Sequence, residues 1–188
     1  PGNYTVEQSN LPTYSDVGDT DGGNPNVISV TLPAGGTSSG NNFVDERKAT
    51  LGDRVFLDAD RDGQQDAGEA GVAGVTVNLL NAAGSVVGTQ TTNAQGDYLF
   101  TNLDAGTYSV EFVKPNGFDF TTANTGADGS DSDANQTTGR TGSYTLQGGD
   151  DNRTVDAGLV VKQATLGDKV FEDKNANGVQ DAGEAGIS

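Results

Sequence analysis

Six oxygen-bearing residues lie within one twelve-residue stretch at the spacing of a cation-binding loop. The stretch reads DADRDGQQDAGE, and positions 1, 3, 5, 7, 9 and 12 are Asp58, Asp60, Asp62, Gln64, Asp66 and Glu69. Alternate residues turn their carboxylates inward, Gly63 permits the sharp turn, the backbone carbonyl of Gln64 supplies one ligand and Glu69 closes the shell with two oxygens. This is the spacing of an EF-hand loop, and it predicts Ca²⁺ as the occupant.

Repulsion among the carboxylates of this stretch favours the same occupant. Five carboxylates fall within twelve residues. Each pair at about 4 Å costs roughly 1 kcal/mol in water and about 4 kcal/mol at an effective dielectric constant near 20. A divalent cation relieves this cost, so we expect the loop to be loose without one. The alternative interpretation is an acidic surface turn that binds nothing.

A softened copy of the loop follows 115 residues later. Residues 166–188 read LGDKVFEDKNANGVQDAGEAGIS and repeat residues 51–73, which read LGDRVFLDADRDGQQDAGEAGVA. The candidate ligands of this copy are Asp173, Asn175, Asn177, Val179 through its carbonyl, Asp181 and Glu184. Amides replace two of the carboxylates, so we expect weaker calcium binding here, because ligand charge tunes the affinity.

Several other carboxylates are tentative metal ligands at less diagnostic spacing. They are Asp128, Asp131 and Asp133 in the stretch GADGSDSDANQ, Asp19 and Asp21 near the start of the chain, and Asp53 and Asp168 in two LGD segments. For the first five, the alternative is a plain Asp-rich turn. The two LGD residues could instead simply end a strand.

The composition excludes several kinds of chemistry. Lys and Arg total 10 against 27 Asp and Glu, giving a formal charge of −17 that repels nucleic acid and anionic membrane surfaces. The chain has no Cys and no His, which removes thiolate and imidazole sites and His-based catalysis. The apolar runs are too short for membrane insertion. Carboxylate pairs could serve a glycosidase, but they are grouped at cation-loop spacing, so we expect no enzyme.

An internal repeat divides the chain into three parts. Besides the two loop copies, PGNYTVE at residues 1–7 resembles AGTYSVE at residues 105–111. We therefore interpret residues 1–48 as the C-terminal half of one repeat, residues 49–161 as a complete repeat and residues 162–188 as the N-terminal part of the next, with about 115 residues per repeat. We expect the natural protein to be a far longer tandem array.

Apolar and polar residues alternate within the complete repeat. Val75, Val77 and Leu79 show this period of two, which is typical of half-buried strands. Turn signals separate seven expected strands, at residues 51–57, 74–81, 86–92, 97–101, 106–113, 141–147 and 153–161. The pattern predicts an all-β fold, an immunoglobulin-like antiparallel β-sandwich. Strand-like segments also flank the loop, whereas an EF-hand would flank it with helices.

Four segments of the complete repeat together resemble a known family. They are LGDRVFLDADRDGQQDAGEAGVAGVTVNLL, GDYLFTNLDAGTYSVEFVKPNGF, SDSDANQTTGRTGSYTL and TVDAGLV. These are similar to the B-type (SdrD B-like) repeats of serine-aspartate repeat adhesins, which resemble the collagen-adhesin B-type (Cna B-type) fold. The resemblance covers nearly the whole chain. It implies calcium-stabilised sandwiches stacked into a stalk on bacterial surface and secreted proteins, with residues 58–69 as the main calcium site.

One property of some Cna B-type domains does not carry over to this sequence. In those domains a Lys of the first strand is crosslinked to an Asn or Asp of the last strand, assisted by a Glu. Asp156 and Glu111 stand near two of these places, but residues 51–57 contain no Lys. We predict no isopeptide bond in the complete repeat. An intact mass lower than the sequence mass by one water or one ammonia would contradict this.

The leading functional hypothesis is structural: a calcium-stabilised repeat that forms a rigid stalk or fibre segment of a bacterial extracellular adhesin or matrix protein. Its partners would be neighbouring repeats of the same chain. One alternative is an adhesion module that binds an extracellular ligand through Tyr14, Phe118 and Phe120, although for the two Phe residues we favour packing at the sandwich edge. A second is a filament in which the incomplete end units pair with copies of the chain.

Overall fold

The computed structural model describes residues 1–163 and 169–187. Within these ranges the regular elements are β-strands, so the all-β prediction is confirmed. The described residues accordingly contain no helix that could span a membrane.

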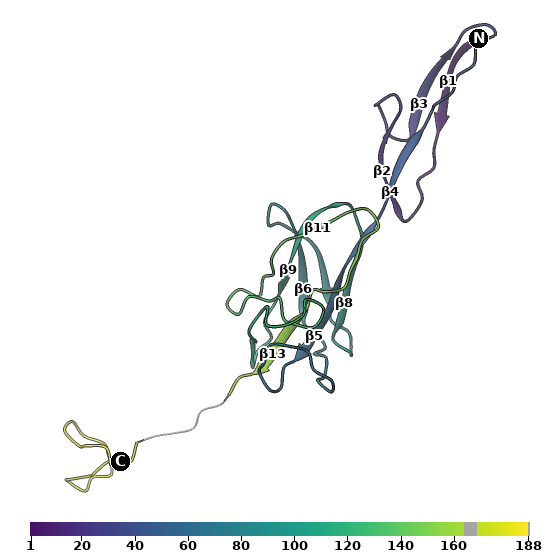
Figure 1. The fold of residues 1–188 in the computed structure, drawn as a ribbon. Helices are drawn as coiled ribbons and strands as arrows, with labels where there is room; N and C mark the ends of the chain where they lie inside the picture. The colour runs from purple at the N-terminus through teal and green to yellow at the C-terminus, as the bar shows by residue number, and fades with distance from the viewer. Residues whose placement is uncertain (164–168, 188) are drawn as a thin grey trace.

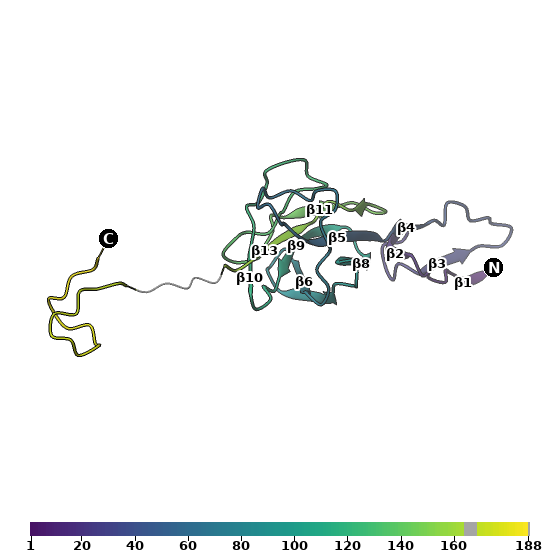
Figure 2. The same cartoon turned by 90° about the horizontal axis from the view of Figure 1, so that it is seen from below.

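A two-sheet sandwich occupies the middle of the chain (Figures 1 and 2). Its strands are β5 Ala49–Leu57, β6 Thr76–Asn81, β7 Val86–Thr91, β8 Asp97–Leu103, β9 Gly106–Phe112, β10 Phe118–Phe120, β11 Tyr144–Leu146, β12 Asp151–Asn152 and β13 Ala157–Val161. One sheet has the order β10, β13, β5, β12, with β8 also paired to β5. The other has the order β11, β9, β6, β7.

The direction of the last strands differs from the prediction of a purely antiparallel sandwich. β13 runs parallel to β5, with Ala157 opposite Val55, and β12 is also parallel to β5, with Asp151 opposite Thr50. A period of two shows which residues face inward but not which way a strand runs. Most of the repeat lies between β5 and these two strands, and a parallel pairing needs such a long connection. The three-residue β10 was not predicted.

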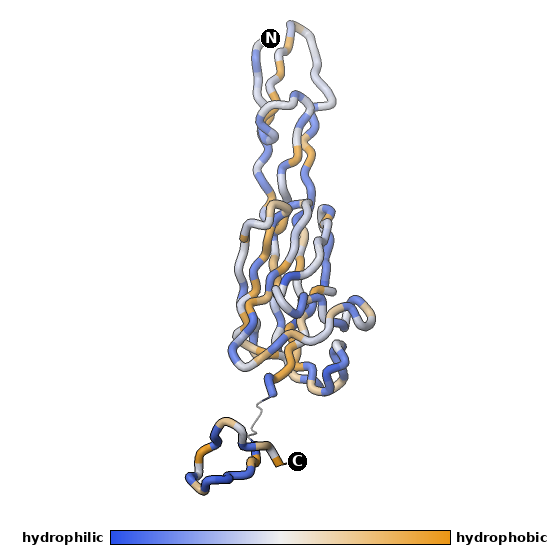
Figure 3. Tube along the Cα trace, turned by 90° about the vertical axis from the view of Figure 1, so that its left-hand side faces the viewer, coloured by the Kyte–Doolittle hydropathy of each residue, from blue (hydrophilic) through white to orange (hydrophobic). Residues whose placement is uncertain are grey.

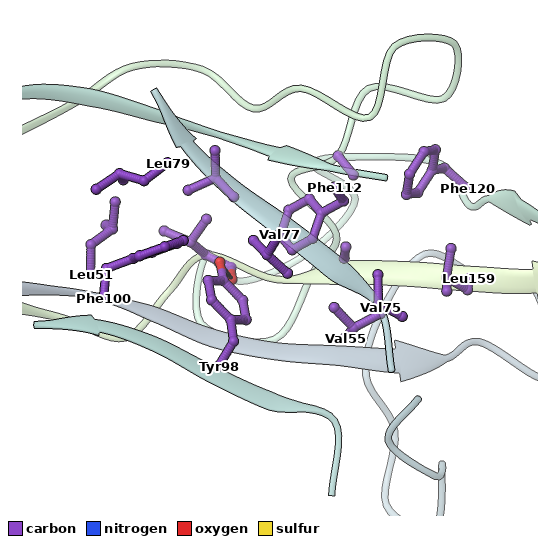
Figure 4. Close-up of a cluster of buried hydrophobic side chains, with 14 of the residues drawn as sticks. Leu51, Val55, Val75, Val77, Leu79, Tyr98, Phe100, Phe112, Phe120 and Leu159 are labelled. Atoms are coloured by element: carbon purple, nitrogen blue, oxygen red, sulfur yellow. Dashed lines mark hydrogen bonds between the residues drawn. The ribbon is translucent and has the colours of Figure 1, made fainter. Parts of the chain in front are cut away.

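The hydrophobic core lies between the two sheets (Figure 4). Tyr98 from β8 belongs to this core, and its ring packs edge to face against Phe100 and Phe112 at centroid distances of 5.9 and 5.6 Å. Its hydroxyl donates a hydrogen bond to the carbonyl of Val155 at 2.7 Å, which satisfies the buried oxygen. Hydrophobic segments accordingly follow the strands of the sandwich in Figure 3.

The core also explains two aromatic residues that the ligand-binding alternative used. Phe120 is only 4% exposed and belongs to the core, and Phe118 packs against it. The interpretation of these two rings as exposed ligand contacts is therefore wrong. Tyr14 lies elsewhere, with the guanidinium of Arg47 6.0 Å from its ring centroid.

Two further strand pairs precede the sandwich and extend from one end of it (Figure 1). Their strands are β1 Gly2–Glu7, β2 Tyr14–Asp19, β3 Val27–Leu32 and β4 Phe43–Arg47. β1 pairs with β3 and places Tyr4 opposite Val30, while β9 pairs with β11 and places Tyr108 opposite Tyr144. The sequence similarity between these regions thus has a counterpart in strand pairing.

Candidate metal centre

The loop that begins at Asp58 is fixed at both ends by the sandwich. β5 ends at Leu57, whose backbone N–H donates to the carbonyl of Ala70 at 2.8 Å. Asp58 donates its own N–H to the carbonyl of Leu159 in β13 at 3.0 Å. Residues 58–69 therefore form a loop whose two ends are hydrogen-bonded to each other and to β13. In an EF-hand, helices hold the loop instead.

Carboxylate oxygens converge inside this loop. One group comprises Asp58, Asp60 and Glu69, and a second comprises Asp60, Asp62 and Asp66, with one oxygen of each member within 4.8 Å of those of the others. Asp60 belongs to both groups. In the part of the chain that the structure describes, no other acidic side chains gather in threes at this separation. The donor set, oxygen only and rich in carboxylate, suits a hard cation such as Ca²⁺.

Backbone N–H groups hold the carboxylates of the first and last residues of the loop in place. Asp58 is 2% exposed, and its two oxygens accept hydrogen bonds from the backbone of Arg61 at 2.6 Å and Gly63 at 2.9 Å. Glu69 accepts from the backbone of Ala59 at 2.7 Å and of Asp66 at 3.0 Å. The first and last ligands are therefore oriented by the loop's own backbone.

A hydrogen bond also connects positions 5 and 7 of the loop. The backbone N–H of Gln64 donates to Asp62 at 2.8 Å, which fixes the carboxylate at position 5. Gly63 between them has a φ of 86°, in the left-handed region that the sharp turn requires. The backbone conformation of Gly63 therefore agrees with the expected sharp turn at position 6 of the loop.

The Asp-rich segment that follows β10 closes over the loop. Gln65 donates its N–H to the carbonyl of Ser130 at 2.6 Å, and Ser132 donates to the carbonyl of Gly63 at 3.1 Å. The hydroxyl of Thr121 donates to Asp58 in a short hydrogen bond. These long-range contacts were not predicted, because nothing in the local spacing of Thr121 or Ser132 relates them to a loop sixty residues earlier.

The tentative ligands in this segment do not come together as a cation site. Asp128 is exposed, whereas Asp131 and Asp133 are buried. Asp131 accepts from the N–H of Gly126 at 2.9 Å and has a second oxygen without a hydrogen-bond partner. Asp133 accepts from the N–H of Asp156 at 2.8 Å, and burial raises its pKa to about 6. Asp133 thus connects the segment to the residue before β13, whereas the hydrogen bond of Asp131 lies within the segment.

Asp53 is half-buried in β5, and Asp156 is buried just before β13. Asp156 is 1% exposed and accepts from the N–H of Arg54 at 3.1 Å, and its other oxygen has no hydrogen-bond partner. Burial, followed by the nearby charge of Asp53, raises the pKa of Asp156 to about 8. Burial also raises the pKa of Asp53. Glu111 lies apart from this pair and is bound to Arg140 at 2.8 Å.

The remaining tentative ligands, Asp19, Asp21 and Asp168, belong to the segments before and after the sandwich. Asp19 accepts from the backbone of Gly22 at 2.7 Å and Asp21 from that of Ser29 at 2.8 Å, so both shape a turn. The hydrogen bond from Ser29 is the main cause that lowers the pKa of Asp21. Asp168 lies outside the described residues.

The second loop copy repeats the backbone hydrogen bonds of the first. Glu184 accepts from the N–H of Lys174 at 2.9 Å and of Asp181 at 2.9 Å, as Glu69 does in the first loop. Asp173 accepts from Gly178 at 2.8 Å, and this bond is the main cause that lowers the pKa of Asp173. Gly178 has a φ of 76°. Both copies therefore adopt the same loop conformation.

Side chains at positions 3 and 5 distinguish the two copies. The amide groups of Asn175 and Asn177 both donate to one oxygen of Asp181, at 2.6 and 2.7 Å. In the first loop, Asp60 and Asp62 at these positions can only repel Asp66. The second loop thus satisfies its own carboxylate, whereas the first concentrates charge that a cation would neutralise.

Comparison with known proteins identifies the architecture around this site. Residues 49–159 match the SdrD B-like domain family. The chain belongs to this family. Serine-aspartate repeat-containing protein D of Staphylococcus aureus (strain Newman) is 40% identical over 195 residues, which cover all of this chain and 14% of that protein. Serine-aspartate repeat-containing protein F of Staphylococcus epidermidis is 38% identical, covering all of this chain and 11% of that protein.

SdrD B-like membership establishes the general role and location of the chain. The chain is a repeat segment of a surface protein, a structural kind of protein, and its place is outside the cell at the bacterial surface. It spans 11% and 14% of the length of these two relatives.

Solved structures show similarity at low sequence identity. The Bacillus anthracis TIE protein has a TM-score of 0.47 at 15% identity, covering 85% of this chain and 25% of that chain. The shaft pilin SpaA of Lactobacillus rhamnosus GG has a TM-score of 0.37 at 16% identity, covering 63% of this chain and 50% of that chain.

Proposed function

We propose that the chain is a calcium-stabilised structural segment of an extracellular adhesin or matrix protein, in which successive SdrD B-like repeats form a rigid stalk or fibre. The observation that carries the proposal is the convergence of Asp58, Asp60, Asp62, Asp66 and Glu69 in a loop anchored to β5 and β13. Extracellular calcium modules typically bind at about 10⁻⁴ to 10⁻³ M, which suits a surface protein. Neighbouring repeats are the partners that this function requires.

The loop is joined to the strand by which the chain leaves the sandwich. The guanidinium of Arg61 donates to the carbonyl of Val161 at 2.8 Å, at the end of β13. Together with the bond from Asp58 to Leu159, this contact ties the loop to the last strand of the repeat. Calcium that orders the loop would therefore also order the strand that leads to the next repeat.

Thermal unfolding in millimolar Ca²⁺ and in chelator tests the proposal. We expect chelation to lower the melting temperature and the resistance to protease, because the loop carboxylates then repel one another. A double variant, Asp62→Ala with Glu69→Ala, should behave in calcium as the wild type does in chelator.

A matched control removes two carboxylates elsewhere, at Asp119 and Glu111, each bound in a surface ion pair at 2.8 Å. This variant should keep its response to calcium. A wild-type melting temperature that does not change on chelation would overturn the proposed role of calcium.

A second candidate function is self-assembly, which the exposed face of β1 favours. Val6 is 38% exposed and Tyr4 is 52% exposed. Val110, the repeat counterpart of Val6, is fully buried in the sandwich. A filament would form if strands of another copy covered this face. Light scattering over a range of concentrations tests it: a mass that stays monomeric throughout excludes the filament.

A further inference from the structure

The strand that leads into the sandwich is held at the end opposite to the calcium loop. β4 and β5 are separated by Lys48 alone, whose backbone N–H donates to the carbonyl of Thr13 at 2.8 Å. β5 then runs for nine residues, about 30 Å at 3.3 Å per residue, before the loop begins. Contacts at the start of β5 are therefore far beyond the screening length of about 10 Å from the calcium ligands.

Asp104, in the turn between β8 and β9, is the first contact at this end. Its carboxylate binds the ammonium group of Lys48 at 2.6 Å and accepts a hydrogen bond from the hydroxyl of Ser15 in β2. The Lys48 and Ser15 contacts, in that order, lower the pKa of Asp104. One carboxylate of the sandwich thus binds both the connector and the half repeat that precedes it.

Gly148, in the turn between β11 and β12, is the second contact. Its N–H donates to the carboxylate of Glu46 in β4 at 3.2 Å. A Cβ atom at Gly148 would lie 2.0 Å from the Cγ of Glu46, so the side chain of Glu46 lies directly over the glycine. Any larger residue at this position would displace Glu46.

We propose that Asp104 and Gly148 form an upstream clasp, which binds Ser15, Glu46 and Lys48 of the preceding repeat and its connector and fixes the angle between two repeats without calcium. The inference rests on the proposed stalk function, because a fixed angle between repeats has a purpose in a stalk. It adds an asymmetry: each repeat would hold its predecessor by ion pairs and shape and its successor through the calcium loop. The partner of the clasp surface is the preceding SdrD B-like repeat, through its strands β2 and β4 and the connector residue Lys48.

The distance distribution between two spin labels tests the clasp in the intact chain. The chain has no Cys, so Ser29→Cys in β3 and Gln90→Cys in β7, both exposed, accept labels selectively. We expect a narrow distribution in calcium. It should stay narrow in chelator at a temperature well below unfolding. At 1 M salt, where the screening length is about 3 Å, it should broaden, because the side chains of Lys48 and Asp104 are 23% and 65% exposed.

Two variants and one control separate the clasp from general stability. Asp104→Asn removes the charge and Gly148→Val displaces Glu46, so each should broaden the distribution in calcium. Glu111→Gln, which breaks an ion pair of 2.8 Å that does not touch the preceding repeat, should leave it narrow. An unchanged width in both clasp variants would overturn the inference, as would a wild-type distribution that chelator broadens as much as the variants do.

The melting temperatures of the same samples keep the two proposals distinguishable. If the clasp variants broaden the distribution and chelation does not change the melting temperature of the wild type, the clasp is supported and the proposed role of calcium is contradicted. If chelation lowers the melting temperature and the clasp variants stay narrow, the role of calcium stands and the clasp fails.

Discussion

The sandwich buries a carboxylate, that of Asp156, with an oxygen that has no hydrogen-bond partner. Only the backbone of Arg54 donates to its other oxygen. Burial and the neighbouring Asp53 favour its neutral form, which is why the pKa rises to about 8 from an ordinary 3.8. Because the folded protein binds this proton more tightly than the unfolded chain, the free energy of unfolding falls as the pH rises from about 4 to about 8.

Replacing this one residue should remove that dependence on pH. Asp156→Asn keeps an oxygen for the N–H of Arg54 and removes the charge. We expect it to change the free energy of unfolding little at pH 4 and to raise it by about 5 kcal/mol at pH 8, since one pKa unit corresponds to about 1.4 kcal/mol and the shift is about four units. Urea unfolding in saturating calcium, which keeps the loop carboxylates neutralised, measures the difference.

An exposed aspartate provides the matched control for this substitution. Lys114 lowers the pKa of Asp119, so Asp119→Asn should bring no gain at pH 8. An Asp156→Asn variant less stable than the wild type at pH 8 would show that the charged form is compensated in the fold.

At the scale of elements, the sequence contains the loop itself but not what surrounds it. The spacing of acidic residues and the glycine at position 6 predicts a local conformation, and both copies have it with the same backbone hydrogen bonds. Alternation likewise predicts the β-strands of the sandwich. The parallel pairing of β13 with β5 and the closure of the segment near Ser130 over the loop depend on contacts between residues distant in the sequence, which no local pattern encodes.

The two loop copies provide a matched test of that closure. Gly63 and Gly178 both have a positive φ, of 86° and 76°. A Cβ atom at Gly63 would lie 2.5 Å from the carbonyl of Thr122, whereas one at Gly178 meets nothing within 4 Å. Gly63→Ala should therefore add a steric clash to a backbone cost of about 1–2 kcal/mol.

Calorimetric unfolding of both variants measures the effect. We expect Gly63→Ala to lower the melting temperature of the sandwich and to weaken calcium binding, because the segment near Thr122 must move away from the loop. Gly178→Ala carries the same backbone strain without the clash and should leave the transition of the sandwich unchanged. Equal effects of the two substitutions would mean that the covering segment does not support the first loop.

At the scale of the whole molecule, the formal charge is −17, and the two loops contain unequal numbers of the carboxylates that produce it. The first has five carboxylates, and the second has three, one of which already accepts hydrogen bonds from Asn175 and Asn177. We therefore expect the intact chain to bind calcium in two steps, with the first loop filled before the second. Isothermal titration calorimetry of the wild type measures both steps.

Restoring the missing charges should bring the two steps closer together. Asn175→Asp with Asn177→Asp removes the donors to Asp181 and recreates the acidic pattern of the first loop, so the weaker step should tighten by about tenfold, or about 1.4 kcal/mol. It should still remain weaker than the first, because the segment that covers the first loop supplies a support that charge alone does not replace. A double variant whose two steps become equal would show that carboxylate number alone sets the affinity, and one whose weaker step does not change would place calcium outside the second loop.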